Sequence, residues 1–501
     1  MSPSPPLDPL QDESDDDLEP EDGGEVSGVL ARRLDQLRDE RWFGPVLESA
    51  LAQMTAAGPK VAGYEIDYCK IKPNRDINVA LRARLAGPTG AALAPLRLSC
   101  TLFASPEACR LKYGEDEANA LHEATRRRLE AAGFARPVAV LGDPPIIVRL
   151  FPVDPALPGL AAATDGEEMK SLFASRLEAC RRTGGAPRGF THEILHYKPR
   201  RSCTIHYTVD LGDGSEPAAC RVYGKLSRDD RGVRYHRLLT SAWEAALASG
   251  GLWRAARPVG YVPRWRLLLQ EAVPGRDFRL VFAELTPDDV TPAQLERIGG
   301  LLDGIARAIR GVQRAPIPDG PVMTFERLFA AQERNLRYMG GLQPRLAAEL
   351  AAIRKEVERL ARETAPAPLV FSHGDFAHGN VLIEGDRVGI IDFDKAGAAE
   401  PVYDVAYFLT HMRSFGIRHP RRMPHVTRLG ERFRDCYLAL APEASAERLS
   451  LYEALDFSAY VLRNFRKQSH QASWLAWAEG QVAAAWERLG AAAGRKGARP
   501  S

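Results

Sequence analysis

The spacing of apolar residues divides the chain into parts with different periods. From about residue 279 onward, apolar residues recur every three or four positions, which is the period of an amphipathic helix. A similar spacing over residues 28–57 predicts one or two helices near the start of the chain. Residues 371–394 interrupt the later helices with short apolar runs that predict strands. The later helices are predicted at residues 292–305, 346–363, 402–415, 424–440, 446–466 and 470–492.

Two stretches between these helical parts resemble each other and form an internal repeat. Lys72-Pro-Asn-Arg75 matches Lys198-Pro-Arg-Arg201, and Ala135-Arg-Pro-Val138 matches Ala256-Arg-Pro-Val259. Both copies show strand-like runs in the order hairpin, strand, helix, strand. The alternative, that two unrelated α+β units share short words by accident, stays open at this level.

Composition and charge narrow the class of protein. The chain has 501 residues, 45% hydrophobic and 26% charged, which is typical of a globular protein of about three domains. Residues 1–27 are acidic and are predicted to form a disordered tail. A net charge of +2 argues against nucleic acid as a partner, and no apolar stretch is long enough for a membrane span. Seven cysteines without a C-x-x-C pair predict reduced thiols and a cytoplasmic location.

The segment from Phe371 to Asp394 carries the residues with the clearest chemistry. Asp375 precedes Asn380 by five positions, and Asp392 follows after a short apolar stretch. Protein kinases place a catalytic Asp, an Asn and a metal-binding Asp in the same order. Asp375 is therefore the candidate that orients and deprotonates an acceptor hydroxyl. Asn380 and Asp392 offer the hard oxygen ligands that magnesium prefers.

The residues between these groups predict how they meet. Residues 381–383 and 388–391 have the pattern of two short buried strands, and residues 384–387 that of a hairpin turn. Gly379 lets the backbone bend tightly before the first strand. The hairpin should return the chain so that Asp392 lies beside Asn380.

These motifs resemble those of the aminoglycoside phosphotransferase and choline kinase superfamily, whose catalytic loop commonly has the pattern H-G-D-L-H-x-x-N. Ala377 stands where the second histidine is common, and many relatives have a small residue there. Downstream, residues 397–406 resemble the family's G-x-x-x-x-D-L-A segment, so the resemblance implies that Asp404 supports the catalytic loop. The matching motif residues are His373, Gly374, Asp375, Asn380, Ile391, Asp392 and Phe393.

The resemblance implies an α+β, bilobal protein-kinase-like fold with a small β-rich N-lobe and a large helical C-lobe. We expect the N-lobe at residues 181–278 and the C-lobe, with the catalytic loop, at 279–495. Residues 28–180 should hold a helix and a degenerate second N-lobe-like domain. The implied activity is transfer of the γ-phosphoryl group of ATP, or another nucleoside triphosphate, to a hydroxyl of a small molecule, with Mg as cofactor.

Six further residues are candidates for binding the nucleotide. Lys225, near the end of a central strand, would hold the α- and β-phosphates. Glu244, nineteen residues later on a helix, would pair with Lys225, although Glu271 could take its place. If the family pattern holds, the backbone of Gln270 to Ala272 would face the adenine edge.

The hairpin before Lys225 lacks a G-x-G-x-x-G loop and instead carries basic residues. Arg201 and Ser202 offer a cation and a hydroxyl to the phosphates, and a solvated basic turn is an equally good interpretation. When Cys100 is aligned with Cys220, the first copy has Ser105 where the second has Lys225. We therefore interpret the first copy as a degenerate lobe that serves as a cap or docking module.

The late helices bear on the acceptor. They are basic and aromatic, with Tyr460 to Lys467 and then Trp474 and Trp477. This favours a neutral or anionic acceptor over a polycationic aminoglycoside, although tryptophan at helical spacing is more often part of a core. A catalytically weak or inactive nucleotide-binding scaffold is the alternative function. The acceptor's identity and the oligomeric state stay open.

Overall fold

The computed structural model describes residues 28–494 except for 73–74, 88–90, 118–122, 184–185, 212–218, 286–289 and 469–472. The predicted acidic tail, residues 1–27, lies outside these described residues. The described chain forms two compact units. We call residues 28–236 and 258–272 the sheet unit, and residues 237–257 and 273–494 the helical unit. The boundary falls within helix α8 (Arg231–Ala248).

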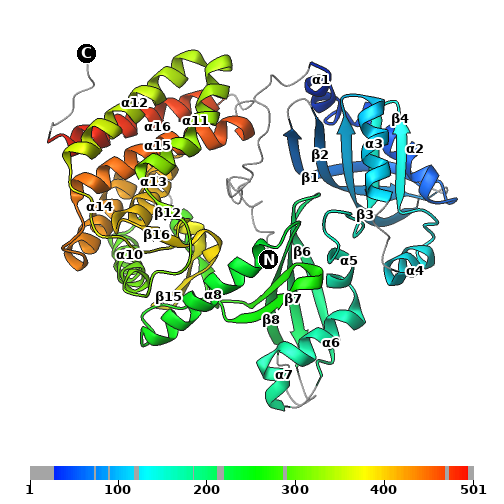
Figure 1. Cartoon of the computed structure of the whole chain (residues 1–501), viewed down its shortest axis with the longest axis horizontal. Coiled ribbons are helices and arrows are strands. Elements are labelled where there is room, and N and C mark those ends of the chain that lie inside the picture. Colours follow the sequence, from blue (N-terminus) through cyan, green and yellow to red (C-terminus); the bar gives the residue numbers. More distant parts are fainter. Residues whose placement is uncertain are drawn as a thin grey trace. The chain divides into compact units, whose positions relative to one another are not determined.

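The sheet unit begins with a five-stranded antiparallel sheet in the order β1-β2-β3-β5-β4 (Figure 1). Alternate residues of β3 point to opposite faces. Leu98 and Cys100 lie in the core that helix α2 covers, whereas Phe103 packs with Cys109 of helix α3 on the other face. The elements are α1 (Gly28–Gln36), α2 (Glu40–Met54), β1 (Lys60–Lys72), β2 (Asp76–Ala86), β3 (Ala92–Phe103), α3 (Pro106–Glu117), α4 (Glu123–Ala131), β4 (Val138–Gly142) and β5 (Pro145–Leu150).

A second five-stranded antiparallel sheet follows in the order β6-β7-β8-β10-β9. Both sheets share the same strand order, with a helix between the third and fourth strands in the sequence. This confirms the repeat and the predicted fold class. The strands are β6 (Gly189–Lys198), β7 (Ser202–Asp210), β8 (Ala219–Ser227), β9 (Pro258–Val262) and β10 (Leu267–Glu271).

The strand register corrects one detail of the repeat. Lys225 pairs with Thr204, which lies two residues after Ser202, the first residue after the β6–β7 turn. In the first copy, Thr101 pairs with Asn78, two residues after the equivalent turn ends. Thr101, and not Ser105, is therefore the structural equivalent of Lys225. Ser105 lies after β3, where its hydroxyl accepts a hydrogen bond from the first turn of α3.

Three short helices between the two sheets pack on the second sheet. Met169, Phe173 and Cys180 are buried in one core with Tyr207 and Val222. The expected boundary near residue 180 therefore falls within this packing. The helices are α5 (Leu160–Ala163), α6 (Gly166–Arg176) and α7 (Glu178–Thr183).

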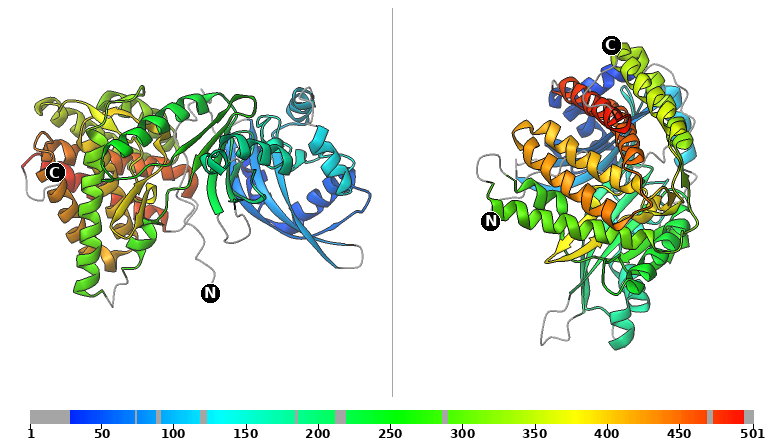
Figure 2. Two further views of the ribbon diagram at one scale, coloured as in Figure 1. Left: turned by 90° about the horizontal axis from the view of Figure 1, so that it is seen from below. Right: turned by 90° about the vertical axis from the view of Figure 1, so that its left-hand side faces the viewer.

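The helical unit consists mainly of long helices, drawn from green to red in Figure 2. Their positions confirm the helices predicted from apolar spacing. Thr291 begins α10 with a capping box to Gln294, which satisfies free amides at the helix start. In the part of the chain that the structure describes, no helix is long and apolar enough to cross a membrane. The helices are α9 (Phe278–Ala283), α10 (Pro292–Gln313), α11 (Phe325–Leu342), α12 (Pro344–Glu363), α13 (Val402–Arg418), α14 (Met423–Leu440), α15 (Ala446–Gln468) and α16 (Trp474–Ala492).

Two small sheets lie within the helical unit, one in the order β11-β14-β15 and one in the order β12-β16-β13. The predicted hairpin is present, with Glu384 paired to Arg387 on either side of its turn. The strands are β11 (Arg276–Asp277), β12 (Val322–Met323), β13 (Val370–Ser372), β14 (Val381–Glu384), β15 (Arg387–Ile390) and β16 (Gly397–Ala399).

Candidate active site

The catalytic loop is held at its base by a buried carboxylate. Asp404, in the first turn of α13, is 1% exposed. It accepts hydrogen bonds from the Ser372 hydroxyl (3.0 Å), the His373 amide (2.8 Å) and the Gly374 amide (3.0 Å). Gly374 has a φ of +81°, and an added Cβ would lie 2.3 Å from the Lys395 carbonyl oxygen. This position therefore requires glycine.

His373 joins the catalytic loop to the segment that carries Asp392. Its Nδ1 accepts a hydrogen bond from the Asp375 amide (3.2 Å), and its Nε2 lies 2.9 Å from the Ile391 carbonyl oxygen. These two contacts fix the imidazole with its proton on Nε2. The buried ring thus holds the backbone of Asp375 at a fixed distance from that of Ile391, the residue before Asp392.

The hairpin brings Asn380 and Asp392 together, as predicted. The Ile391 amide donates to the Asn380 carbonyl (3.0 Å). The Asn380 side-chain amide donates to the Asp375 carbonyl (2.9 Å), which orients its oxygen away from that bond. Asp392 has left-handed backbone angles (φ 70°, ψ 59°), an uncommon conformation for a residue other than glycine. Such conformations are concentrated at functional sites.

Asp375 lies in a partly buried site beside a cation. The Lys395 ammonium is 3.2 Å from its Oδ2, and the two side chains are 25% and 22% exposed. Burial alone would raise the pKa of Asp375. The Lys395 charge and a hydrogen bond from the Tyr407 hydroxyl outweigh burial, so this pKa lies below its usual value. Asp375 is therefore a carboxylate at neutral pH. Neither Lys395 nor Tyr407 was indicated by the motif.

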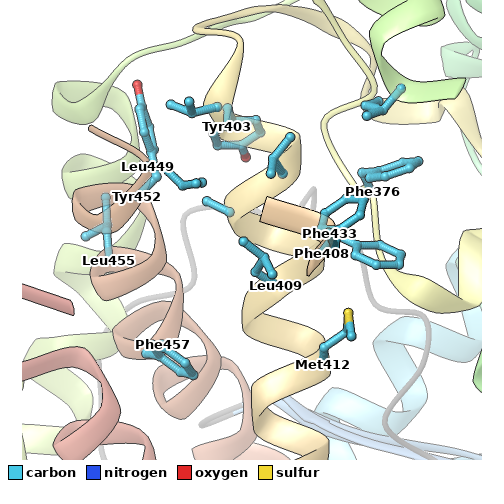
Figure 3. Close-up of a cluster of buried hydrophobic side chains, with 14 of the residues drawn as sticks. Phe376, Tyr403, Phe408, Leu409, Met412, Phe433, Leu449, Tyr452, Leu455 and Phe457 are labelled. Carbon is cyan, nitrogen blue, oxygen red and sulfur yellow. The ribbon is translucent and has the colours of Figure 1, made fainter. Parts of the chain in front are cut away.

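The residue after Asp375 anchors the loop in the helical core. Phe376 is fully buried, and its ring centroid lies 5.4 Å from that of Phe408 on α13. Phe408 in turn packs against Phe433 of α14 (Figure 3). The side chain of Asp375 is thus placed between a hydrogen-bonded histidine and a packed phenylalanine, which leaves the loop little freedom.

Asn380 and Asp392 fit a magnesium ion by the chemistry of their donors. Both side chains are partly exposed and carry oxygen ligands, and a backbone hydrogen bond holds Asn380 beside Ile391, the residue before Asp392. Magnesium usually binds one or two protein oxygens together with substrate phosphates and water. The residues present therefore match the expected cofactor.

The nucleotide candidates of the sheet unit share one face of the second sheet. Val222 and Leu226 on β8 face the core, so Lys225 points to the opposite face. Leu268, the partner of Lys225 on β10, precedes Gln270 by two residues, which places Gln270 on this same face. Ser202 begins β7 on this face as well.

The remaining candidates are Ala272, Glu244 and Arg201. The Ala272 amide donates to the Arg221 carbonyl (2.9 Å), so its carbonyl oxygen is the backbone group left for a base edge. Glu244 is exposed and lies on the face of α8 opposite the buried Ala242. The ion pair between Glu244 and Lys225 stays a prediction. Arg201 lies in the turn before β7, with its amide bonded to the Lys198 carbonyl (3.0 Å).

Two tryptophans and one arginine of the late helices are used for packing. Trp474 and Trp477 are 3% and 8% exposed and belong to the helical core. Arg413 forms a buried ion pair with Glu453 (2.8 Å). These residues are therefore structural, and they no longer support the predicted preference for a neutral or anionic acceptor.

His411 on α13 offers a pH test of the helical core. Burial, together with Arg463 and Lys395, lowers the pKa of His411 to about 3. Because the folded-state pKa lies below the unfolded value of about 6.5, the unfolded chain binds the proton more readily, and stability falls as pH drops below 6.5. We expect a loss of about 2 kcal/mol from this residue between pH 7 and 5. Urea unfolding of wild type and His411→Gln at both pH values measures this, and equal losses in both proteins would contradict it.

The sequence around this loop matches a known family of enzymes. Residues 197–442 match the sequence model of the phosphotransferase enzyme family, which confirms the resemblance that the motifs indicated. The matched segment begins at the end of β6 and ends after α14, so it contains strands β7, β8, β9 and β10 of the second sheet and the catalytic loop, but not the first sheet. No curated protein matches the chain.

Several solved structures are similar over most of their length. A choline/ethanolamine kinase family protein from Mesorhizobium loti is 14% identical, with 65% of this chain and 98% of that chain covered and a TM-score of 0.41. The choline kinase LicA from Streptococcus pneumoniae is 13% identical, with 65% and 98% covered and a TM-score of 0.40. A thermostable mutant of aminoglycoside phosphotransferase APH(4)-Ia is 14% identical, with 65% and 99% covered and a TM-score of 0.43. Scores this low carry no weight in the assignment.

Proposed function

We propose that this protein is an ATP- and Mg-dependent phosphotransferase that moves the γ-phosphoryl group to a hydroxyl of a small molecule. The observation that carries the proposal is the loop around Asp375. An ionised carboxylate, fixed in position and paired with a cation, shares the loop with Asn380, and a backbone hydrogen bond from Ile391 brings the segment of Asp392 beside that loop. Phosphoryl transfer requires a group that accepts the proton of the acceptor hydroxyl and groups that neutralise the charge on the phosphates.

Each group has a distinct part in the proposed reaction. Asp375 orients the acceptor hydroxyl and accepts its proton as the oxygen attacks the γ-phosphorus, whose bond to the bridging oxygen breaks to release ADP. Asn380 and Asp392 would hold magnesium, which when bound neutralises the charge on the phosphates. Lys395 keeps Asp375 ionised before the acceptor binds.

The second sheet supplies the proposed nucleotide contacts. Lys225 binds the α- and β-phosphates, with Glu244 as its partner. Arg201 and Ser202 in the preceding turn add a cation and a hydroxyl for the phosphates. The backbone at Gln270 and Ala272 contacts the base. These roles follow from the resemblance, and for Lys225, Ser202 and Gln270 also from the sheet face that they share.

Loss of the Lys225 charge should weaken nucleotide use. A hydrogen bond to a charged group contributes about 1.5–3 kcal/mol, so Lys225→Met should lower kcat/KM for ATP by about 10–100-fold. Steady-state kinetics with varied ATP measure this, once an acceptor has been found by screening sugars, amino alcohols and aminoglycosides. Arg221→Met, which removes a cation from the same face of the same strand, is the matched control. Equal effects of both changes would contradict the role of Lys225.

A further inference from the structure

The hairpin turn that precedes Lys225 is held from outside the second sheet. Asp154 follows β5 of the first sheet by four residues and is 6% exposed. Its Oδ2 accepts hydrogen bonds from the Arg200 amide (2.7 Å) and from the Tyr197 hydroxyl (3.0 Å). One carboxylate of the linking segment thus binds both the end of strand β6 and the tip of the β6–β7 hairpin. We call these two hydrogen bonds of Asp154 the grip.

The conformation of this turn needs such support. Arg200 has a φ of 63°, in the left-handed region that residues with a side chain rarely adopt. The neighbouring bonds, from the Arg201 amide to the Lys198 carbonyl and from the Arg228 amide to the Arg201 carbonyl, lie within the second copy. The Asp154 carboxylate accepts a further hydrogen bond from Arg200, the strained residue itself. Hydrogen bonds to charged acceptors are the stronger ones.

Asp154 is itself well fixed. Its Oδ1 accepts a hydrogen bond from the Ala156 amide (3.0 Å). The Tyr197 ring packs edge-on against Phe151, with centroids 5.3 Å apart, and Tyr197 is 3% exposed. Burial, and next the Asp154 charge, raise the pKa of Tyr197, so its hydroxyl stays protonated and donates. Tyr197 also bonds to Ser99 on β3, which ties the grip to the first sheet.

In the described residues of the first sheet, buried polar side chains surround the position that corresponds to Lys225. Thr101, the equivalent of Lys225, bonds to Asn78 (3.2 Å) and lies within 3.4 Å of an Arg149 nitrogen. Asn78 bonds in turn to Asp76. All four side chains are at most 8% exposed, so a buried polar network fills this face. Side chains of the first copy therefore fill the face that corresponds to the Lys225 face. The feature of the first copy that bears on the nucleotide is its contact with the second copy.

We propose that Asp154 is a positioning residue through which the first copy preorganises the β6–β7 turn for nucleotide phosphates. The inference rests on the proposed function, because it assigns the turn at Arg201 and Ser202 to the nucleotide. Loss of the grip lets the turn relax from the left-handed conformation. Nucleotide binding must then restore that conformation, which lowers affinity and leaves the chemical step unchanged.

Two alanine variants of the full-length protein test this. Asp154→Ala removes the grip, and Asp165→Ala removes a carboxylate of the same unit that also accepts two amide hydrogen bonds, as the cap of α6. Asp154→Ala should weaken Mg-ATP binding about fivefold to tenfold, measured by calorimetry, with kcat at saturating ATP within about twofold of wild type. Asp165→Ala should bind ATP as wild type does. Equal affinities of the two variants would overturn the proposal.

Hydrogen exchange without nucleotide separates this inference from the proposed function. Amides at residues 200–203 should exchange about tenfold faster in Asp154→Ala than in Asp165→Ala, because the turn opens more often. Tyr197→Phe, which leaves the Arg200 bond in place, should give a smaller increase. If wild type binds no ATP yet this exchange pattern appears, the proposed function fails and the grip stands. Unchanged exchange in Asp154→Ala overturns the grip whatever the protein binds.

Discussion

Asp375→Asn is expected to lower kcat for phosphoryl transfer by about 10²–10⁴-fold, the range that general base catalysis contributes. Asparagine keeps the size of the side chain but cannot accept the acceptor's proton. It also leaves Lys395, 3.2 Å away in the wild type, without its ionic partner. Nucleotide affinity should change little, because the proposed phosphate and base contacts lie on the second sheet. The measurement is kcat with the best acceptor from the screen, together with calorimetric binding of Mg-ATP.

Asp386→Asn is the matched control for this change. Asp386 lies in the exposed turn of the β14–β15 hairpin, eleven residues along from Asp375, and it should be replaceable without loss of rate. Turnover by Asp375→Asn at the wild-type rate would contradict the assignment of the base. If wild type binds Mg-ATP but transfers to no hydroxyl acceptor, the inactive scaffold becomes the better description.

The parts of the site that the sequence predicted are those set by local chain geometry. Asp375, Asn380 and Asp392 lie within eighteen positions, and a two-residue turn with paired flanks determines how they meet. The period of apolar residues likewise predicted six long helices of the helical unit, because each helix buries one face against its neighbours, but it did not predict α11. These features depend on residues that are close in the sequence.

The features that the sequence did not predict depend on pairing between distant segments. Tyr407 reaches Asp375 from α13, and no spacing rule links the two. Alignment of the two copies through Cys100 and Cys220 predicts Ser105 as the equivalent of Lys225, because it counts residues along the sequence and ignores strand pairing. Strand pairing, which fixes the true register, assigns Thr101 instead.

The tryptophans show a second limit of sequence reasoning. Trp474 and Trp477 suggested an acceptor surface, but both are buried in the helical core. The same composition fits a binding surface or a packed helix interface, because an aromatic side chain suits either environment. Only the packing of α16 against its neighbouring helices distinguishes the two.

Asp404→Ala is expected to reduce both stability and activity, and the two losses should arise together. The change leaves the Ser372 hydroxyl and the amides of His373 and Gly374 without their acceptor in a buried site. Each buried group that loses its partner costs about 1–3 kcal/mol, so a total loss of about 3–5 kcal/mol in the free energy of unfolding is expected. Because these groups set the path of the loop into Asp375, kcat should fall by at least about 100-fold, the scale expected for a catalytic group misplaced by about 1 Å.

The comparison of the two aspartates distinguishes support from chemistry. Urea unfolding and kcat are measured for Asp404→Ala, for the isosteric Asp404→Asn and for Asp375→Asn. Asp404→Asn keeps one acceptor oxygen and should lose less of both quantities than Asp404→Ala. Asp375→Asn should lose activity with a much smaller loss of stability, since its side chain is partly exposed to solvent. If Asp404→Ala unfolds at the wild-type urea concentration and is still inactive, Asp404 acts in the reaction itself. Its proposed role as a structural support of the catalytic loop is then wrong.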